Sequence, residues 1–266
     1  MKRAIVIVAL ALVPAVALGI GAWRTYWPGG ELPPLLTSPK DPLLPDLTMK
    51  PLADVQSLFS QSGSRQIHFS ATIANAGGGP LIVHAARSNS DASSWRLTQR
   101  FRESDGTLSE RGTPGTLVWG GHGHNHWHAR MGASYELRSL DGKSEPRSYV
   151  KAGFCFFDQE PYRRDLPGAP KRAVFPKNIC SDHEGKEVQM GLSVGWQDPY
   201  YWILPDQAID ITGLPEGDYR LTASADPENW FRETSERNNS TWVDIRLSSR
   251  ASDGAPLVEV IRSSNG

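Results

Sequence analysis

The amino-acid sequence predicts a mainly β protein, an antiparallel β-sandwich with long irregular loops that form the site. Short runs of alternating apolar and polar residues recur along the chain, as in strands that bury one face. The 20 prolines and 25 glycines among 266 residues favour turns over long helices. The hydrophobic content of 39% suffices for one large β domain or two small ones.

The N-terminal segment, residues 1–23, predicts export. Lys2 and Arg3 precede an apolar run from position 4 to 22, which is the layout of a signal peptide. The run is also nearly long enough to span a bilayer, with an aromatic anchor at Trp23. We therefore expect a cleaved signal peptide or a membrane anchor. Either alternative places the following domain outside the cytoplasm, as a secreted, periplasmic or membrane-attached protein.

The rest of the chain divides by composition. Residues 24–43 are rich in proline and glycine and predict a linker. The folded domain is expected to span residues 44–250, followed by a peripheral tail at 251–266. The formal net charge of −1 gives no reason to expect nucleic acid as a partner.

The expected strands follow in order along this domain. Residues 67–77 alternate and lead through the Gly77–Pro80 turn into 81–84, which we expect to pair with them. Asp105–Gly106 predicts a hairpin turn. Proline, glycine and charged residues between 158 and 197 predict irregular loops. Further strands are expected at residues 95–101, 133–140, 148–158, 208–211, 218–225 and 241–247.

Cys155 and Cys180 are the two cysteines of the chain, separated by 25 residues (180 − 155). In an oxidising compartment we expect them to form a disulfide, which would stabilise the fold by about 3 kcal/mol. The alternative is two buried free thiols.

A histidine-rich stretch is the strongest chemical signal in the sequence. His124, His126 and His128 alternate, so on a strand their imidazoles would project from one side of the sheet. An all-nitrogen set suits copper or zinc better than calcium or magnesium. On a regular strand the first and third Cα atoms would be about 13 Å apart, so the strand must bend or bulge for all three to reach one ion. The alternative is a solvated histidine run that binds nothing.

Several short motifs occur in a fixed order around this stretch. After the histidines come Lys151–Cys155, Asp198–Tyr200 and Ile209–Thr212. In this order the motifs resemble the lysyl oxidase catalytic domain, and the similarity extends over about residues 44–247. Each motif is short, but their collinearity is specific. The resemblance implies a bacterial-type member of the family without accessory domains.

The resemblance implies a copper amine oxidase that builds its organic cofactor from its own chain. His124, His126 and His128 match the family's copper(II) ligands. Lys151 and Tyr200 match the two precursors of lysine tyrosylquinone. The implied reaction is oxidative deamination of a primary amine, including lysine in a protein, to an aldehyde. Molecular oxygen is consumed, and ammonia and hydrogen peroxide are released.

Two further residues receive roles from the resemblance. Asp198 matches a family aspartate and is the candidate base that removes the α-proton of the substrate. Its alternative role is to form a turn before Pro199. His183 also matches a family histidine, and would orient the site or hydrogen-bond the quinone. The loops between residues 158 and 178 differ most from the family, and we expect them to set specificity.

A calcium site is a second implication of the resemblance. Oxygen-bearing residues match the family's calcium ligands, and oxygen is the donor that calcium prefers. Ser235 stands where the family has an aspartate, although Glu236 could replace it. The alternative is an ordinary turn between the last two strands. The matching residues are Asp46, Glu233, Asn238 and Asn239.

Two other functions are compatible with the histidines alone. One is an exported, non-catalytic copper-binding β-sandwich module. The other is a zinc hydrolase that uses Asp198 or another carboxylate as its base. Neither function requires Lys151 and Tyr200, so these two residues distinguish the oxidase from both alternatives.

Overall fold

The structure is a computed structural model that describes residues 41–87, 94–120, 125–130, 132–151, 153–204, 207–250 and 256–264. The chain divides into two compact units, Met1–Pro39 and Lys40–Gly266, and every described residue belongs to the second. The predicted signal or anchor and most of the predicted linker therefore lie outside the described residues. Within the described ranges, no helix has the length and apolar character needed to cross a membrane.

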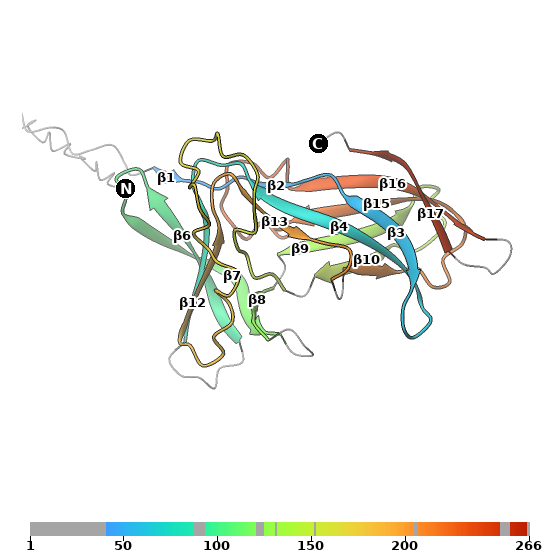
Figure 1. Cartoon of the computed structure of the whole chain (residues 1–266), viewed down its shortest axis with the longest axis horizontal. Coiled ribbons are helices and arrows are strands. Elements are labelled where there is room, and N and C mark those ends of the chain that lie inside the picture. The colour runs from blue at the N-terminus through green and yellow to red at the C-terminus, as the bar shows by residue number, and fades with distance from the viewer. Residues whose placement is uncertain are drawn as a thin grey trace, which may run out of the picture. The chain divides into compact units, whose positions relative to one another are not determined.

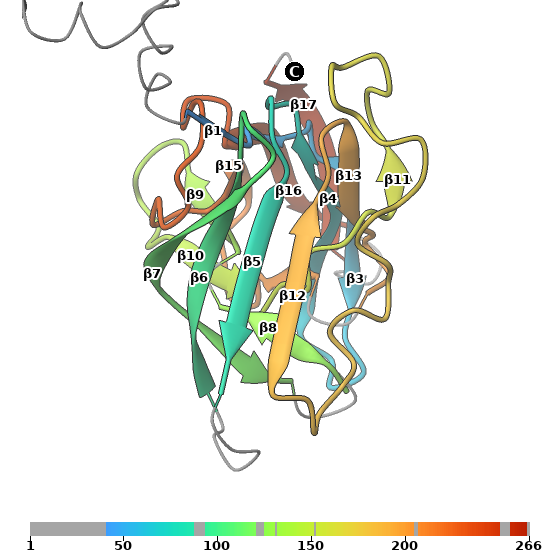
Figure 2. The same cartoon turned by 90° about the vertical axis from the view of Figure 1, so that its left-hand side faces the viewer.

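The predicted mainly β fold is confirmed, because every regular element of the described residues is a strand and every pairing is antiparallel. The first sheet has the order β12–β5–β6–β7–β8, with β1 paired to β6, and Figure 2 shows β7, β6, β5 and β12 side by side. Its strands are β12 (Glu187–Leu192), β5 (Leu81–Ala86), β6 (Ser94–Glu103), β7 (Leu108–Trp119), β8 (Trp127–Ala129) and β1 (Pro42–Leu43).

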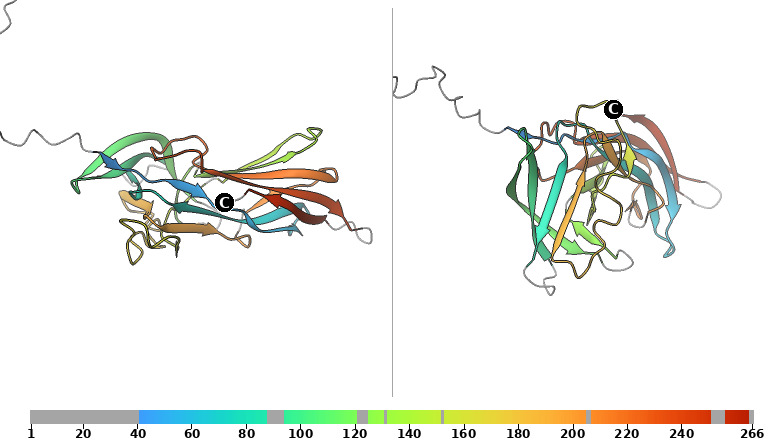
Figure 3. Two further views of the ribbon diagram at one scale, coloured as in Figure 1. Left: turned by 90° about the horizontal axis from the view of Figure 1, so that it is seen from above. Right: turned by 60° about the vertical axis from the view of Figure 1, so that its left-hand side comes forward.

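The second and third sheets form the sandwich that holds most of the core (Figures 1 and 3). The second has the order β10–β9–β15–β16–β17, and the third has the order β11–β13–β4–β14, with β2 and β3 also paired to β4. The second comprises β10 (Arg147–Lys151), β9 (Ala133–Ser139), β15 (Gly217–Ala225), β16 (Ser240–Ser249) and β17 (Pro256–Ser263). The third comprises β11 (Glu160–Pro161), β13 (Trp196–Tyr200), β4 (Arg65–Asn75), β14 (Ala208–Asp210), β2 (Leu47–Met49) and β3 (Ala53–Phe59).

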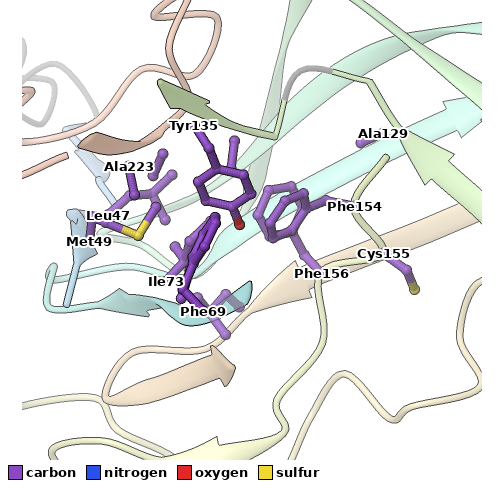
Figure 4. Close-up of a cluster of buried hydrophobic side chains, with 14 of the residues drawn as sticks. Leu47, Met49, Phe69, Ile73, Ala129, Tyr135, Phe154, Cys155, Phe156 and Ala223 are labelled. Atoms are coloured by element: carbon purple, nitrogen blue, oxygen red, sulfur yellow. The ribbon is translucent and has the colours of Figure 1, made fainter. Parts of the chain in front are cut away.

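Alternation along the strands builds this core. In β9, Ala133, Tyr135 and Leu137 are buried, while the residues between them are partly or fully exposed. Phe69 of β4 meets Tyr135 across the sandwich, with ring centroids 4.8 Å apart in an edge-to-face arrangement. Figure 4 shows both rings in a buried cluster with Ile73. Each large apolar side chain buried in this way contributes about 1.5–3 kcal/mol.

The expected pairing of residues 81–84 with 67–77 is wrong. β5 pairs with β6 and β12, so the chain passes from the third sheet to the first between β4 and β5. The glycines of the connection serve close packing. A Cβ on Gly77 would lie 2.5 Å from the amide nitrogen of Asp46, and one on Gly79 would lie 2.5 Å from the carbonyl carbon of Leu43. The Asn75 side chain fixes this crossing by accepting from Asp46 and Gly77 amides.

Two other strand predictions need correction. The strand expected at 148–158 ends at Lys151, and beyond it Phe154 forms only an isolated bridge with Ala129. The stretch 158–197 contains β11, β12 and the start of β13, although residues 162–186 are irregular as predicted. The missed signal in β12 is its own alternation, because Val188, Met190 and Leu192 are all buried.

The remaining predictions fared better. The Asp105–Gly106 hairpin is confirmed, since it joins β6 to β7 and Gly106 has a φ of 83°, a conformation that glycine accepts readily. The expected end of the folded domain at residue 250 needs correction, because the predicted tail contains β17, which pairs with β16 and forms the edge of the second sheet.

Candidate functional site

The two described histidines of the motif lie on either side of Trp127 at the start of β8. His126 is in a bend just before the strand, and His128 is inside it. Their Nε2 atoms lie 2.7 Å apart, with ring centroids 4.3 Å apart. Trp127 points to the opposite side, where it packs against Trp95 and Trp119 in the core. The alternation thus turns both imidazoles away from the tryptophans and brings them together.

The segment Gly153–Cys155 crosses directly beside His128. Phe154 and Ala129 exchange two backbone hydrogen bonds, of 2.9 and 2.7 Å, which fix the segment against β8. A Cβ on Gly153 would overlap Cβ and Cγ of His128 and lie 2.5 Å from its Nδ1. Glycine at this position therefore lets the backbone lie against the imidazole.

The same segment contacts Tyr200, the last residue of β13. The ring centroids of Tyr200 and Phe154 lie 4.3 Å apart, and the Cys155 backbone hydrogen-bonds to the Tyr200 phenol. On the other side of the segment, Lys151 closes β10, where its backbone pairs with Ala133 of β9. Residues 153–155 thus lie between the end of β10, the second described histidine and Tyr200.

The environment of Tyr200 keeps its phenol protonated. Burial raises the pKa of Tyr200 well above its ordinary value of 10.0, and the charges of Asp198 and Tyr135 raise this pKa further. The hydrogen bond from the Cys155 backbone opposes this shift. A phenol in this setting loses its proton only when positive charge is brought near it.

Asp198 is completely buried in β13, two residues before Tyr200. Residues two apart on a strand share a face, so its carboxylate and the phenol lie on the same side of β13. The alternative role of Asp198 as a turn residue is wrong, since Asp198 and Pro199 pair with Ile73 and Thr72 of β4.

His183 lies apart from this group. Its side chain is 51% exposed, and its Nδ1 lies 2.7 Å from Oε1 of Glu184. Its ring stacks on Trp127 with centroids 5.9 Å apart and contacts Trp119 at 4.5 Å. Because Trp127 faces away from the imidazole pair, His183 lies on the other side of β8 from His126 and His128.

The disulfide between Cys155 and Cys180 is confirmed, with a Cα–Cα distance of 6.2 Å. It joins two segments that both contact β8. The amide of Trp127 donates to the Cys180 carbonyl at 2.8 Å, and its indole Nε1 donates to the Asp182 carbonyl at 2.8 Å. The disulfide therefore connects the Tyr200 side of the site to the backbone of the histidine motif.

A second group of residues, which we call the acidic cluster, lies where the calcium ligands were expected. Asn238 Nδ2 donates to Asp46 Oδ1 at 3.0 Å. Asn239 Nδ2 donates to Glu233 Oε1 at 2.7 Å and to Glu236 Oε2 at 2.9 Å. The structure therefore brings together the predicted set and the glutamate named as its substitute. The acidic cluster comprises Asp46, Asp226, Glu233, Glu236, Asn238 and Asn239.

Asp226 is a member that the sequence did not indicate. It follows the end of β15, and a carboxylate oxygen from each of Asp226, Glu233 and Glu236 lies within 4.8 Å of the others. Burial raises the pKa of Glu233 from 4.5 to about 8, and the charge of Glu236 adds to this effect. Burial likewise raises the pKa of Asp226 to about 6. The carboxylates are thus crowded at a place where ionisation is costly.

The asparagines supply the most specific feature of the acidic cluster. The Oδ1 atoms of Asn238 and Asn239 are buried and have no hydrogen-bond partner within the described part of the chain. Buried polar atoms are almost always paired, so two such oxygens, on side chains that hydrogen-bond to the carboxylates of the cluster, fit a hard cation such as calcium.

The lysyl oxidase family model matches residues 85–253, which is more than half of the chain. The protein belongs to the lysyl oxidase family. Lysyl oxidase homolog 2 of Gallus gallus is 27% identical to it over 163 residues, or 59% of this chain. The match spans 19% of the length of that relative.

For a lysyl oxidase, the described histidines offer a suitable pair of donors. Their Nε2 atoms converge, and neutral imidazole nitrogen is a good ligand for copper(II). Three histidines can reach one ion only if the strand bends, and the chain does bend at His126. His124, the third residue of the predicted set, lies outside the described residues. We call the arrangement of His126, His128, Gly153–Cys155, Asp198 and Tyr200 the candidate copper centre.

Proposed function

We propose that this protein is a copper-dependent amine oxidase of lysyl oxidase type. It would oxidise primary amines, including lysine side chains of proteins, to aldehydes and release ammonia and hydrogen peroxide. The observation that carries the proposal is the position of Gly153–Cys155. This segment follows Lys151 by two residues, packs on His128 through Gly153, and contacts Tyr200 through Phe154 and Cys155.

Copper(II) held by His124, His126 and His128 would supply oxygen-dependent redox chemistry and a positive charge that favours phenol ionisation. The backbone of Gly153 restricts the His128 ring and so fixes one donor. Phe154 packs against the Tyr200 ring at a tilt of 50° and would limit access of water on that side.

Lys151 and Tyr200 are the proposed precursors of lysine tyrosylquinone. They end strands of different sheets, β10 in the second and β13 in the third, so their link would join the two layers of the sandwich. Asp198, buried on the same face as Tyr200, is the proposed base for the α-proton of the amine substrate. Its burial keeps competing water away from the carboxylate.

The proposal is tested by peptide mass mapping of the copper-loaded full chain after exposure to air. A covalent link between Lys151 and Tyr200 is expected, together with labelling by phenylhydrazine. Labelling should be lost in Tyr200→Phe and kept in the matched control Tyr201→Phe, whose ring is exposed on the adjacent residue. The oxidase proposal would be refuted if Lys151 and Tyr200 stayed unmodified in protein that has bound copper and received oxygen. That result would favour a non-catalytic copper-binding module.

We also propose that the acidic cluster binds calcium. The ligands would be Asp46, Glu233, Asn238 and Asn239, with Glu236 in place of the missing aspartate. Support comes from the two buried amide oxygens without partners and from the all-oxygen donor set. Such an ion would connect the entry to β2 with the segment before β16.

The proposed location is extracytoplasmic. A disulfide persists in oxidising compartments, which fits export of the domain. Residues 1–23 would direct this export, either as a cleaved signal or as a membrane anchor through residues 4–22. Molecular oxygen and an amine-bearing molecule or protein would be its partners there.

A further inference from the structure

The loop between β11 and β12 concentrates exposed positive charge. We call residues 162–177 the basic loop. It carries five exposed basic side chains and a single acidic one, Asp165. The whole chain has a formal net charge of −1, so this excess is local. The five basic residues are Arg163, Arg164, Lys171, Arg172 and Lys177.

The basic loop is irregular but firmly held. The amide of Tyr162 donates to the Gly195 carbonyl at 2.8 Å, and the Trp196 indole donates to the Pro170 carbonyl at 3.1 Å. The buried carboxylate of Asp158 accepts from the amides of Val174 and Phe175 at 2.8 and 3.2 Å. The charges are therefore presented from a fixed scaffold, and binding an opposite charge costs little ordering of the backbone.

These charges are largely unused inside the molecule. Arg163 pairs with Asp165 at 3.0 Å on the surface, and Arg164 lies 5.5 Å from the Trp196 ring centroid. Lys171, Arg172 and Lys177 form no ion pair with any carboxylate of the described ranges. Three of the five cations are thus available to a partner.

The basic loop begins beside the candidate copper centre. Glu160 of β11 pairs with Gln197 of β13, and its carboxylate accepts from the side chains of Gln197 and Tyr201. Figure 2 shows the loop next to β11 and β13. Gln197 and Tyr200 are three residues apart on the strand, or roughly 10 Å. This separation slightly exceeds the Debye length of about 8 Å at physiological ionic strength, so the loop would act on the part of a polypeptide that flanks the amine and extends toward β11, and most strongly at low salt.

We propose that the basic loop binds acidic polypeptide segments and selects amines, such as lysine side chains, that lie among carboxylates. A polycationic segment would meet like charge on the same path and be repelled. The oxidation of such substrates rests on the function proposed above, whereas the binding of acidic segments does not depend on it.

The test uses the full chain and two fluorescent peptides of equal length, each with one central lysine and blocked ends. In one peptide glutamates flank the lysine, and in the other arginines do. Fluorescence anisotropy at low salt should show binding of the acidic peptide about tenfold or more tighter than the basic one, and the difference should shrink as salt rises. Equal binding of the two peptides would overturn the proposal.

The loop is tested with Lys171→Gln/Arg172→Gln/Lys177→Gln. The matched control, Arg96→Gln/Arg102→Gln/Arg111→Gln, removes the same charge from exposed positions of β6 and β7. The loop variant should lose most of the preference for the acidic peptide, and the control should keep it. Retention of the preference in the loop variant, or an equal loss in both variants, would show that the loop is not responsible. Thermal unfolding establishes that each variant is folded.

Peroxide release from the same peptides separates this inference from the proposed function. Preferential binding without peroxide from any amine would refute the oxidase and leave the acidic-segment site standing. Equal peroxide release from both peptides, with no difference in binding, would support the oxidase and refute the role of the basic loop. Faster release from the acidic peptide, lost in the loop variant, would support both.

Discussion

The candidate copper centre and the acidic cluster both gather donors from distant parts of the chain, but their donors differ in charge. Neutral imidazoles can approach closely, and the Nε2 atoms of His126 and His128 lie 2.7 Å apart. Carboxylates in the acidic cluster repel one another, and their burial raises the pKa of Glu233 to about 8. Cation binding at the acidic cluster must therefore compete with protons near neutral pH.

The two sites also differ in what holds them together. The candidate copper centre rests on backbone contacts, a disulfide and the close approach of Gly153 to His128. The acidic cluster rests on hydrogen bonds to its own carboxylates, donated by the side chains of Asn238 and Asn239 and by the backbone amides of Leu47, Trp230 and Phe231. Changes in packing should therefore act on copper binding, whereas changes in charge should act on calcium binding.

The largest expected effect comes from removing the disulfide. Cys155→Ala/Cys180→Ala should lower the free energy of unfolding by about 3 kcal/mol, because it frees a 25-residue loop in the unfolded chain. Copper affinity should fall as well, since Cys180 accepts from the Trp127 amide between the two histidines. Urea unfolding and copper titration measure the two effects. Equal losses of copper and calcium affinity would break the separation between the sites.

A smaller effect is expected from Gly153→Ala. The added methyl group would overlap His128, which should cost about 1–3 kcal/mol and displace that imidazole. Copper affinity should drop while calcium affinity is unchanged, as followed by calorimetric titration. The control is Gly112→Ala, where a Cβ meets nothing within 4 Å. Unchanged copper binding by Gly153→Ala would show that the close approach is not needed.

The smallest effect concerns pH and the acidic cluster. The folded protein retains the Glu233 proton up to about pH 8, whereas the unfolded chain releases it near 4.5. Between these values the folded state binds more protons, so without calcium its stability should fall as pH rises, by about 1–2 kcal/mol after allowance for solvent screening.

Glu233→Gln should flatten the part of this dependence that lies above the pKa of Asp226, which is about 6. Calcium should stabilise the wild type more at pH 8 than at pH 6, because it competes with the proton, and should stabilise the variant less at both. Thermal unfolding in chelator and in calcium measures each effect. A wild type whose calcium-free stability rises from pH 6 to 8 would contradict the raised pKa.

Local pattern was sufficient to predict much of this molecule. Strict alternation of buried residues places β9 and β15 where they were expected. The disulfide between the two cysteines could be predicted from the expected export to an oxidising compartment. The pairing partners of strands are harder to predict than the strands themselves. Gly77 and Gly79 have the sequence pattern of a hairpin turn, but they allow close contact with residues 43–46, which only the folded chain brings near.

The site residues likewise divide into those that the sequence indicates and those that only the fold brings to the site. His126 and His128 are marked by their spacing, and Tyr200 by its motif. Gly153 lies inside the Lys151–Cys155 motif, but its close approach to His128 arises only in the folded chain. Asp226 carries no signal in the sequence, since it joins the acidic cluster only through the path of the chain after β15. Likewise, only the stacking of His183 on Trp127 reveals on which side of β8 it lies.

The buried carboxylate of Asp158 has a consequence for how this protein could be altered. Besides Val174 and Phe175, it accepts from the amide and hydroxyl of Ser193, and the Asp158 amide donates to the Phe175 carbonyl. The Asp158 side chain therefore holds the far end of the basic loop, at Val174 and Phe175, against Ser193, which directly follows β12. Residues 161–173 lie between Asp158 and this far end, and Tyr162 and Pro170 add further contacts with the strand β13 and the turn before it. A different sequence placed between those ends would keep the hydrogen bonds of Asp158. Replacing this segment should therefore change which partners the protein binds while the sandwich stays intact.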